Sequence, residues 1–192
     1  MLNFYHFNIK NYKTLKICQI VIGRVRLPSH HVNTKNQTFL LKSYMADYKR
    51  LFLEGHSYYL TMVTHRRNAI LIDNIDALGE SFRESKQYYG YVINAIVVLP
   101  DHIHMIITPQ NVHDYPKIVR AIKYNFTIKI NQNEEQSMAR HKKGLKPIWQ
   151  KRYYEHTIRD EKDYLRCLEY MKHNPIKHGL VENVNDWEYS SF

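Results

Sequence analysis

Two histidines that stand two residues apart, His102 and His104, are embedded in the apolar, β-branched run of residues 97–107. In a β-strand successive side chains point to opposite faces, so both imidazoles would project from one face while Ile103 and Met105 project from the other. Two nitrogen ligands on one rigid element supply half of a metal site. The competing interpretation is a pair of polar residues on the solvent-exposed face of an antiparallel strand, and the tripeptide alone is compatible with both.

A phenol and an amide form a second candidate pair, Tyr170 and Asn174. A helix predicted over residues 160–173 has a buried stripe that follows the i, i+3, i+4, i+7 rule: Tyr164, Cys167, Leu168 and Met171. Tyr170 lies roughly 120° from Tyr164 around this helix, on the flank of the stripe, and Asn174 follows four residues later. The two side chains can therefore share a face toward a neighbouring sheet. The alternative is a rim tyrosine and an asparagine that caps the helix end.

Alternating and helical patterns predict the elements that position these residues. We expect strands over residues 57–65, 91–99, 102–108 and 149–158, and helices over 73–89, 114–131 and 160–173. The last helix would begin after Asp160 as N-cap and stop before Pro175. This order predicts an α+β fold, most economically a ferredoxin-like βαββαβ arrangement with an antiparallel sheet and a C-terminal helix that carries the chemistry.

The formal net charge of +10 over 192 residues is distributed unevenly. Residues 1–44 hold seven Lys or Arg and no acid, so they carry +7, and the remainder carries only +3. We predict a domain over residues 45–192, preceded by a basic extension that is either loosely ordered or translated from upstream of a true start at Met45. Clusters such as Lys151-Arg152-Tyr153-Tyr154 suit a surface that follows phosphates and stacks bases, or simply a solvated loop.

The composition argues against several classes of protein. Cys18 and Cys167 are the only cysteines and have no Cys-x-x-Cys spacing, which disfavours a disulfide framework or a thiolate zinc site and favours a reducing cytoplasm. No apolar stretch approaches the roughly 20 residues that span a bilayer, and the N-terminus has no secretory pattern. We therefore expect a cytoplasmic protein that is not associated with a membrane.

Several segments together, in this order, carry a resemblance to a known family. They are 45–51 (MADYKRL), 59–68 (YLTMVTHRRN), 97–104 (VVLPDHIH), 148–159 (IWQKRYYEHTIR), Tyr170 with 174–181 (NPIKHGLV), and 186–192 (DWEYSSF). Over about residues 45–192 the chain resembles the insertion-sequence-200-like HUH transposases, and among them the REP-associated tyrosine transposases. HUH denotes His, a hydrophobic residue and His. The family does not typically carry a segment like 1–44, and its members commonly continue beyond the position of Phe192.

The resemblance implies a metal-dependent transposase and endonuclease that acts on single-stranded DNA with hairpin or palindromic repeats. His102, His104 and Asn174 would be the metal ligands, for Mg²⁺ or Mn²⁺. Tyr170 would be the nucleophile that forms a 5′-phosphotyrosine link and releases a 3′-hydroxyl, without a nucleotide triphosphate. The protein would be of bacterial type and associated with the nucleoid. It would act as a monomer or a homodimer, in DNA transposition or in the maintenance of repeats.

The same comparison suggests further contacts around this centre. Six residues are candidates for contacts to the DNA backbone and bases: Arg66, Arg67, Lys151, Arg152, Tyr153 and Arg159. Glu155 and His156 would either support the site from behind or serve the fold alone, and Trp149 is expected in the core.

Three competing functions can be weighed on the sequence. A histidine-triad nucleotide hydrolase would need a third histidine where this chain has Ile106. A two-histidine phosphoesterase would need paired His-φ-Ser/Thr motifs, and no such pair is evident. The remaining alternative is a non-catalytic protein, derived from a transposase, that binds DNA hairpins without cleaving them.

Overall fold

The computed structural model describes residues 50–132 and 148–192. The predicted extension over residues 1–44 and its boundary at Met45 lie outside the described residues. The elements are β1 (Tyr58–Val63), α2 (Ile75–Tyr88), β2 (Tyr91–Val98), β3 (His102–Pro109), α3 (Tyr115–Gln132), β4 (Tyr154–Thr157) and α5 (Glu161–Lys177), with short 3-10 turns between them. The α+β order is therefore confirmed, and most boundaries differ from the predicted ones by only a few residues.

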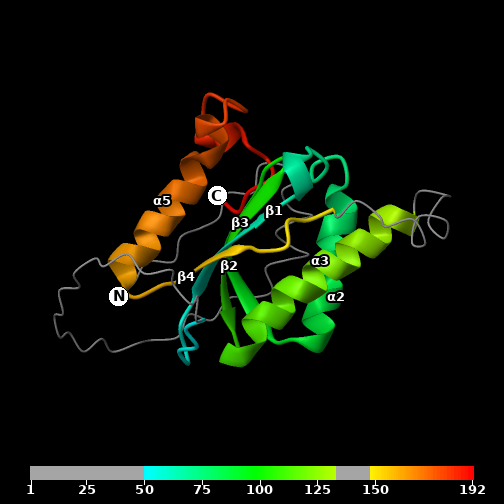
Figure 1. The fold of residues 1–192 in the computed structure, drawn as a ribbon. Helices are drawn as coiled ribbons and strands as arrows, with labels where there is room; N and C mark the ends of the chain where they lie inside the picture. The colour runs from blue at the N-terminus through cyan, green and yellow to red at the C-terminus, as the bar shows by residue number, and fades with distance from the viewer. Residues whose placement is uncertain (1–49, 133–147) are drawn as a thin grey trace, which may run out of the picture.

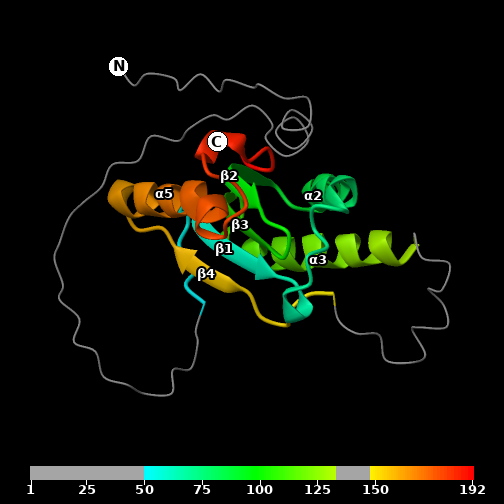
Figure 2. The ribbon, with the colours of Figure 1, turned by 90° about the horizontal axis from the view of Figure 1, so that it is seen from above.

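The four strands form one antiparallel sheet in the order β2-β3-β1-β4. This is the strand order of the predicted ferredoxin-like βαββαβ arrangement. Helices α2 and α3 lie on one face of the sheet, and α5 lies on the other (Figures 1 and 2). The register of β1 against β3 places Thr61 opposite His104 and Val63 opposite His102.

Strand alternation divides the core between the two faces of the sheet. Toward α2 and α3, the strands bury an apolar set that includes Leu60, Met62, Ile103 and Met105. Toward α5, a smaller cluster includes Tyr59, Val97, Ile106 and Met171. His102 and His104 share the parity of Ile106, so both imidazoles lie on the face that α5 covers. They are 3% and 4% exposed, which excludes the solvent-exposed face that the tripeptide left open.

Helix α5 begins as predicted but extends further than predicted. The Asp160 side chain accepts a hydrogen bond from the backbone of Asp163 at 2.8 Å, as an N-cap does. Pro175 was expected to end the helix, but it lies inside α5, which continues to Lys177. Only one turn remains at this point, and Gly179, with φ of +67°, closes the helix end. Asn174 is therefore helical and lies one turn after Tyr170.

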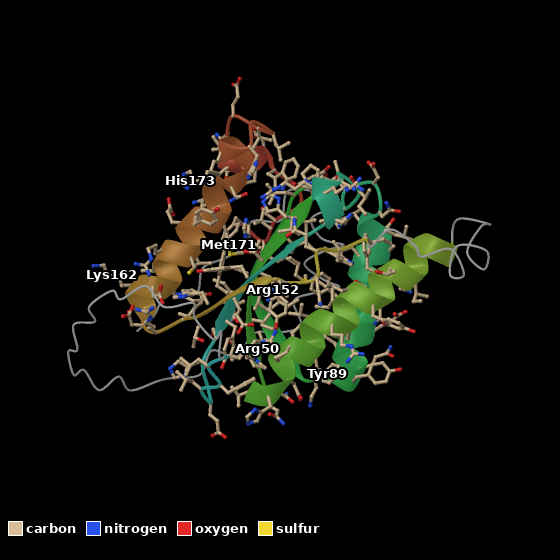
Figure 3. All side chains as sticks on the ribbon, in the orientation of Figure 1. Arg50, Tyr89, Arg152, Lys162, Met171 and His173 are labelled. Atoms are coloured by element: carbon tan, nitrogen blue, oxygen red, sulfur yellow. The ribbon has the colours of Figure 1, made fainter. Side chains whose placement is uncertain are left out.

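Side chains on α5 face two ways. Figure 3 shows Met171 between the helix and the sheet, and Lys162 and His173 on the side that points away from it. Met171 is fully buried in the smaller apolar cluster, where Tyr164, Cys167 and Leu168 pack beside it. This is the stripe predicted from the spacing of apolar residues.

The C-terminal segment protects the free edge of β2. The Val98 amide donates to the Tyr189 carbonyl at 2.8 Å, and the Ser191 amide donates to Ile96 at 2.9 Å. The indole of Trp187 donates to the Val98 carbonyl at 2.9 Å. The Trp-x-x-Ser-Ser segment thus satisfies backbone groups that an exposed edge strand would offer to other chains. Among the described helices, none has both the length and the apolar character needed to cross a bilayer.

Candidate functional site

A cleft of about 670 Å³ lies between α5 and the sheet face that carries the two histidines. Its walls include residues from β1, β3 and β4 on one side and from α5 on the other. The lining residues that bear on chemistry are Arg67, His102, His104, Arg166, Tyr170 and Lys177. The cleft therefore brings the pair of histidines together with Tyr170, although they lie about 70 residues apart in sequence.

His102 is fixed from behind by a carboxylate. Its Nδ1 lies 2.5 Å from Oδ1 of Asp101, and Oδ2 of Asp101 pairs with Arg67 at 3.0 Å. Burial alone would raise the pKa of Asp101, but the hydrogen bonds to His102 and Arg67 outweigh it, and the pKa lies below its ordinary value. An ionised carboxylate holds the imidazole proton on Nδ1. The Nε2 lone pair of His102 is then directed toward the cleft.

His104 is oriented by hydroxyl groups of β1. Its Nδ1 lies 2.7 Å from the Tyr59 hydroxyl and 2.9 Å from Oγ1 of Thr61. Burial is the main reason why the pKa of His104 is lowered to about 3, and the neighbouring imidazoles of His102 and His178 add to the shift. The ring is therefore a neutral imidazole. Its Nε2 is buried and has no hydrogen-bond partner among the residues that the structure describes.

Asn174 completes a set of three buried donor groups. It is 1% exposed, and its Oδ1 lies 3.3 Å from Nε2 of His102. Nε2 of His102 and Oδ1 of Asn174 are both atom types that bind metal ions, and this separation is short enough for one cation to contact both. The orphaned Nε2 of His104 is a third donor beside them. The residues present therefore fit a divalent cation, with imidazole and amide donors of the kinds that bind such ions.

Tyr170 lies at the solvent side of these donors. Its ring centroid is 5.4 Å from that of His104 and 6.5 Å from that of Tyr59. The side chain is 45% exposed, and the ammonium of Lys177 lies 5.3 Å from the ring centroid. The phenol is thus open to a ligand in the cleft, while the buried imidazoles form the wall behind it.

The structure separates the other predicted contact residues into two groups. Arg67 and His156 both line the cleft, and His156 is hydrogen-bonded to Asp163 at 2.8 Å. Glu155 does not lie beside the site, because neighbouring residues of β4 point to opposite faces; it accepts from the Tyr115 hydroxyl at 2.8 Å and from Arg50 at 3.2 Å on the other face. The remaining candidates do not line this cleft: Arg66, Lys151, Arg152, Tyr153 and Arg159.

These outlying residues have distinct surroundings. Arg66, Lys151, Arg152 and Arg159 are exposed. Arg152 lies in the segment that leads into β4 (Figure 3). Tyr153 packs against the larger apolar cluster, as does Trp149, which was expected in the core.

The backbone is strained where β1 turns toward the cleft. Arg66 and Arg67 both have φ of +55°, in the left-handed region that side-chain-bearing residues rarely adopt. Such residues cost on the order of 1–3 kcal/mol each and persist where surrounding contacts hold them. Here the ion pair of Arg67 with Asp101 supplies one such contact. The strained turn therefore helps to hold the carboxylate that orients His102.

Sequence reasoning missed several residues of the cleft. Tyr59 and Thr61 could be found only from the strand register, and Asp101, which holds His102 from behind the cleft, was not singled out. Arg166 and Lys177 did have a pattern that could have revealed them, because they lie four residues before and seven residues after Tyr170 on the same helix.

A second group of possible ligands lies further along the cleft. Ligand atoms of His156, Asp163 and Cys167 lie within 4.8 Å of one another. The carboxylate of Asp163 already accepts hydrogen bonds from His156, from the Arg159 amide at 3.1 Å and from Arg166 at 2.5 Å. This network explains the cluster as an ion-pair assembly that anchors the start of α5.

The Asp163 network predicts a pH-dependent contribution to stability. Burial would raise the pKa of Asp163, but the Arg159 amide, His156 and Arg166 together lower it. Because the pKa of Asp163 is lower in the folded state, its ionised form stabilises the fold. This stabilisation is fully present at a pH above the pKa in the unfolded chain, near 4, and is lost as the pH falls through the pKa in the folded protein. We expect Asp163→Asn to lower the unfolding free energy by about 2 kcal/mol at pH 7. Urea unfolding at pH 7 and at pH 3 should show this difference shrinking in acid; an equal difference at both would contradict the assignment.

Comparison with known proteins places the chain among DNA transposases. The family profile described as "Transposase IS200 like" matches residues 52–174. The REP-associated tyrosine transposase of Escherichia coli K12 is 37% identical over 150 residues, which are 77% of this chain and 83% of that protein. A Haemophilus influenzae protein that provisionally carries the same name is 38% identical over 151 residues, covering 77% of this chain and 86% of the relative.

A solved structure gives the same result in three dimensions. It is described as a REP-associated tyrosine transposase bound to a REP hairpin, and it superposes on this chain with a TM-score of 0.64. The two share 35% sequence identity, and the match covers 77% of this chain and 83% of the other.

Proposed function

This chain belongs to the IS200-like transposase family, in its REP-associated tyrosine transposase branch, and from this premise we propose that it cleaves and rejoins single-stranded DNA at hairpin sites through Tyr170. One observation carries the proposal. A solvent-open phenol shares one cleft with the buried imidazoles of His102 and His104, and the buried amide of Asn174 contacts His102 directly behind them. All four side chains come from one copy of the chain, so a single copy would hold a complete site.

The proposed reaction is a transesterification at phosphorus. The Tyr170 oxygen attacks the scissile phosphate, a bond forms between that oxygen and phosphorus, and the bond from phosphorus to the 3′-oxygen breaks. The phenol proton leaves to solvent, and the departing 3′-oxygen gains a proton to become a hydroxyl. The energy of the phosphodiester bond is kept in the 5′-phosphotyrosine link. The same step run backward, with a 3′-hydroxyl as nucleophile, rejoins strands.

The buried donors of the cleft would hold a divalent ion, Mg²⁺ or Mn²⁺. When bound, the ion would supply Lewis-acid polarisation of the scissile phosphate. The chain's own contribution is to fix the donor atoms before the substrate arrives. Asp101 holds the ring of His102 so that Nε2 points inward, and the hydroxyls of Tyr59 and Thr61 hold the ring of His104 in the same way.

The proposed substrate rests on the likeness to a solved relative. That protein is described as bound to a REP hairpin, and this chain shares 35% identity with it over most of both chains. We extend the hairpin substrate to this chain on that basis. The family match over residues 52–174 further supports the assignment of residues 45–192 to the transposase domain.

The test is a cleavage assay on hairpin oligonucleotides taken from the flanks of the gene. We expect an SDS-resistant protein–DNA adduct and a free 3′-hydroxyl product on a denaturing gel with Mn²⁺ or Mg²⁺, and neither with EDTA. Hairpin binding without any adduct would overturn the catalytic proposal in favour of a non-catalytic hairpin-binding protein.

A further inference from the structure

Two cations on α5 flank the nucleophile that the proposed function assigns. At about 100° per residue, Tyr170 lies about 40° from Arg166 around the helix, and Lys177 lies between them in angle. All three line the same cleft. Along the axis, Arg166 lies about 6 Å before Tyr170, and Lys177 about 10 Å after it. The nucleophile is therefore placed between two positive charges on one face of one helix.

Arg166 is anchored at one end and open at the other. Its guanidinium contacts Oδ1 of Asp163 at 2.5 Å, and the Asp163 side chain is only 5% exposed. The Arg166 side chain itself is 71% exposed. A guanidinium has five N–H donors in a rigid plane, so a single carboxylate contact leaves donors that face the cleft. The anchoring also reduces the side-chain freedom that would be lost on binding.

Lys177 offers its charge without a competing acid. It is exposed, and among the residues that the structure describes it forms no ion pair. Its ammonium lies near the Tyr170 ring. The acid among the lining residues is Asp163, which is already engaged by Arg166 and His156. The charge that remains in the cleft is positive, as an anionic ligand requires.

We propose that Arg166 and Lys177 form a phosphate clamp, a two-point binding site for DNA phosphates on either side of the scissile one. Their backbone positions are about 16 Å apart along α5. Because Arg166 lies before Tyr170 and Lys177 lies after it along the helix, we assign the two cations to different phosphates of the strand. The clamp rests on the proposed function, because it takes Tyr170 as the point of attack. It gives the strand a direction across the cleft that the buried donors alone do not define.

Binding without chemistry tests the clamp. In the full chain carrying Tyr170→Phe, with EDTA present, anisotropy of a labelled single-stranded hairpin gives the affinity as a function of salt. We expect Lys177→Met and Arg166→Met each to weaken binding by about tenfold at low salt, and to the same degree for unrelated single strands. Each should reduce the slope of log K against log[salt] by about 0.7, the loss of one phosphate contact.

Control variants separate the clamp from general charge and from folding. Lys172 lies about 140° from Lys177 on the same helix, and Arg120 is exposed on α3, on the other side of the sheet. Lys172→Met and Arg120→Met should therefore leave the slope of log K against log[salt] unchanged. Arg166→Lys should retain most of the affinity. Thermal unfolding confirms that each variant is folded.

The outcomes distinguish the clamp from the function on which it rests. If the Tyr170→Phe protein binds the hairpin, but Lys177→Met and Arg166→Met leave its slope of log K against log[salt] unchanged, the clamp alone is overturned. A Tyr170→Phe protein that binds no single-stranded DNA would overturn the proposed function and the clamp with it.

Discussion

Tyr170→Phe abolishes the covalent protein–DNA adduct and leaves hairpin affinity within about twofold of wild type. The substitution removes one hydroxyl from a side chain that is 45% exposed, and that hydroxyl makes no hydrogen bond within the described part of the chain. Such a surface change alters stability by about 0.5 kcal/mol or less. The loss of chemistry should therefore be complete without loss of the fold. Denaturing gels of the adduct, together with anisotropy on the same hairpin, measure the two effects separately.

Two other tyrosines of the cleft provide the controls. Tyr154 is 60% exposed and lines the same cleft, so Tyr154→Phe removes a comparable phenol and should keep the adduct. Tyr59 is a poor candidate nucleophile, because burial raises its pKa well above the ordinary value and its hydroxyl is hydrogen-bonded to His104. An adduct that persists in Tyr170→Phe, or whose labelled peptide in mass spectrometry contains another tyrosine, would contradict the assignment.

The local patterns of the chain were sufficient to predict the elements and which side chains share a face. Period-two alternation put His102 and His104 on one face of β3, and helical spacing put Tyr170 and Asn174 one turn apart on α5. No local pattern predicts that this face of β3 and this face of α5 contact each other. This contact depends on α5 packing against the β3 face, 70 residues away in sequence, and the expectation came from the resemblance to a family rather than from spacing.

The finer features of the site depend on register and backbone conformation. Thr61 reaches His104 because β1 pairs with β3 in one particular register. This register cannot be read from the pattern of either strand alone. The left-handed turn at Arg66 and Arg67 has no glycine to predict it. By contrast, the two alternatives left open for Glu155 and His156 could have been narrowed, because adjacent residues of a strand point to opposite faces and only one of the two could enter the cleft.

His104→Ala is expected to reduce Mn²⁺ affinity by more than about 100-fold and to abolish cleavage. Nε2 of His104 is a buried donor without a protein partner, and its removal leaves only two of the three proposed ligand groups. Asp101→Ala should weaken Mn²⁺ binding by about 10- to 100-fold, since it releases the imidazole of His102 while leaving every ligand present. Electron paramagnetic resonance of free Mn²⁺ measures both effects without relying on catalysis.

The matched controls decide where the ion binds. His173 lies on the side of α5 that points away from the sheet (Figure 3), so His173→Ala should leave Mn²⁺ affinity unchanged. His156→Ala removes a member of the second group of possible ligands, in which Asp163 is already engaged by Arg166 and the Arg159 amide. Loss of Mn²⁺ binding in His156→Ala, with normal binding in His104→Ala, would move the metal to that group. The opposite result would place it beside Tyr170, where the phosphate to be attacked must lie.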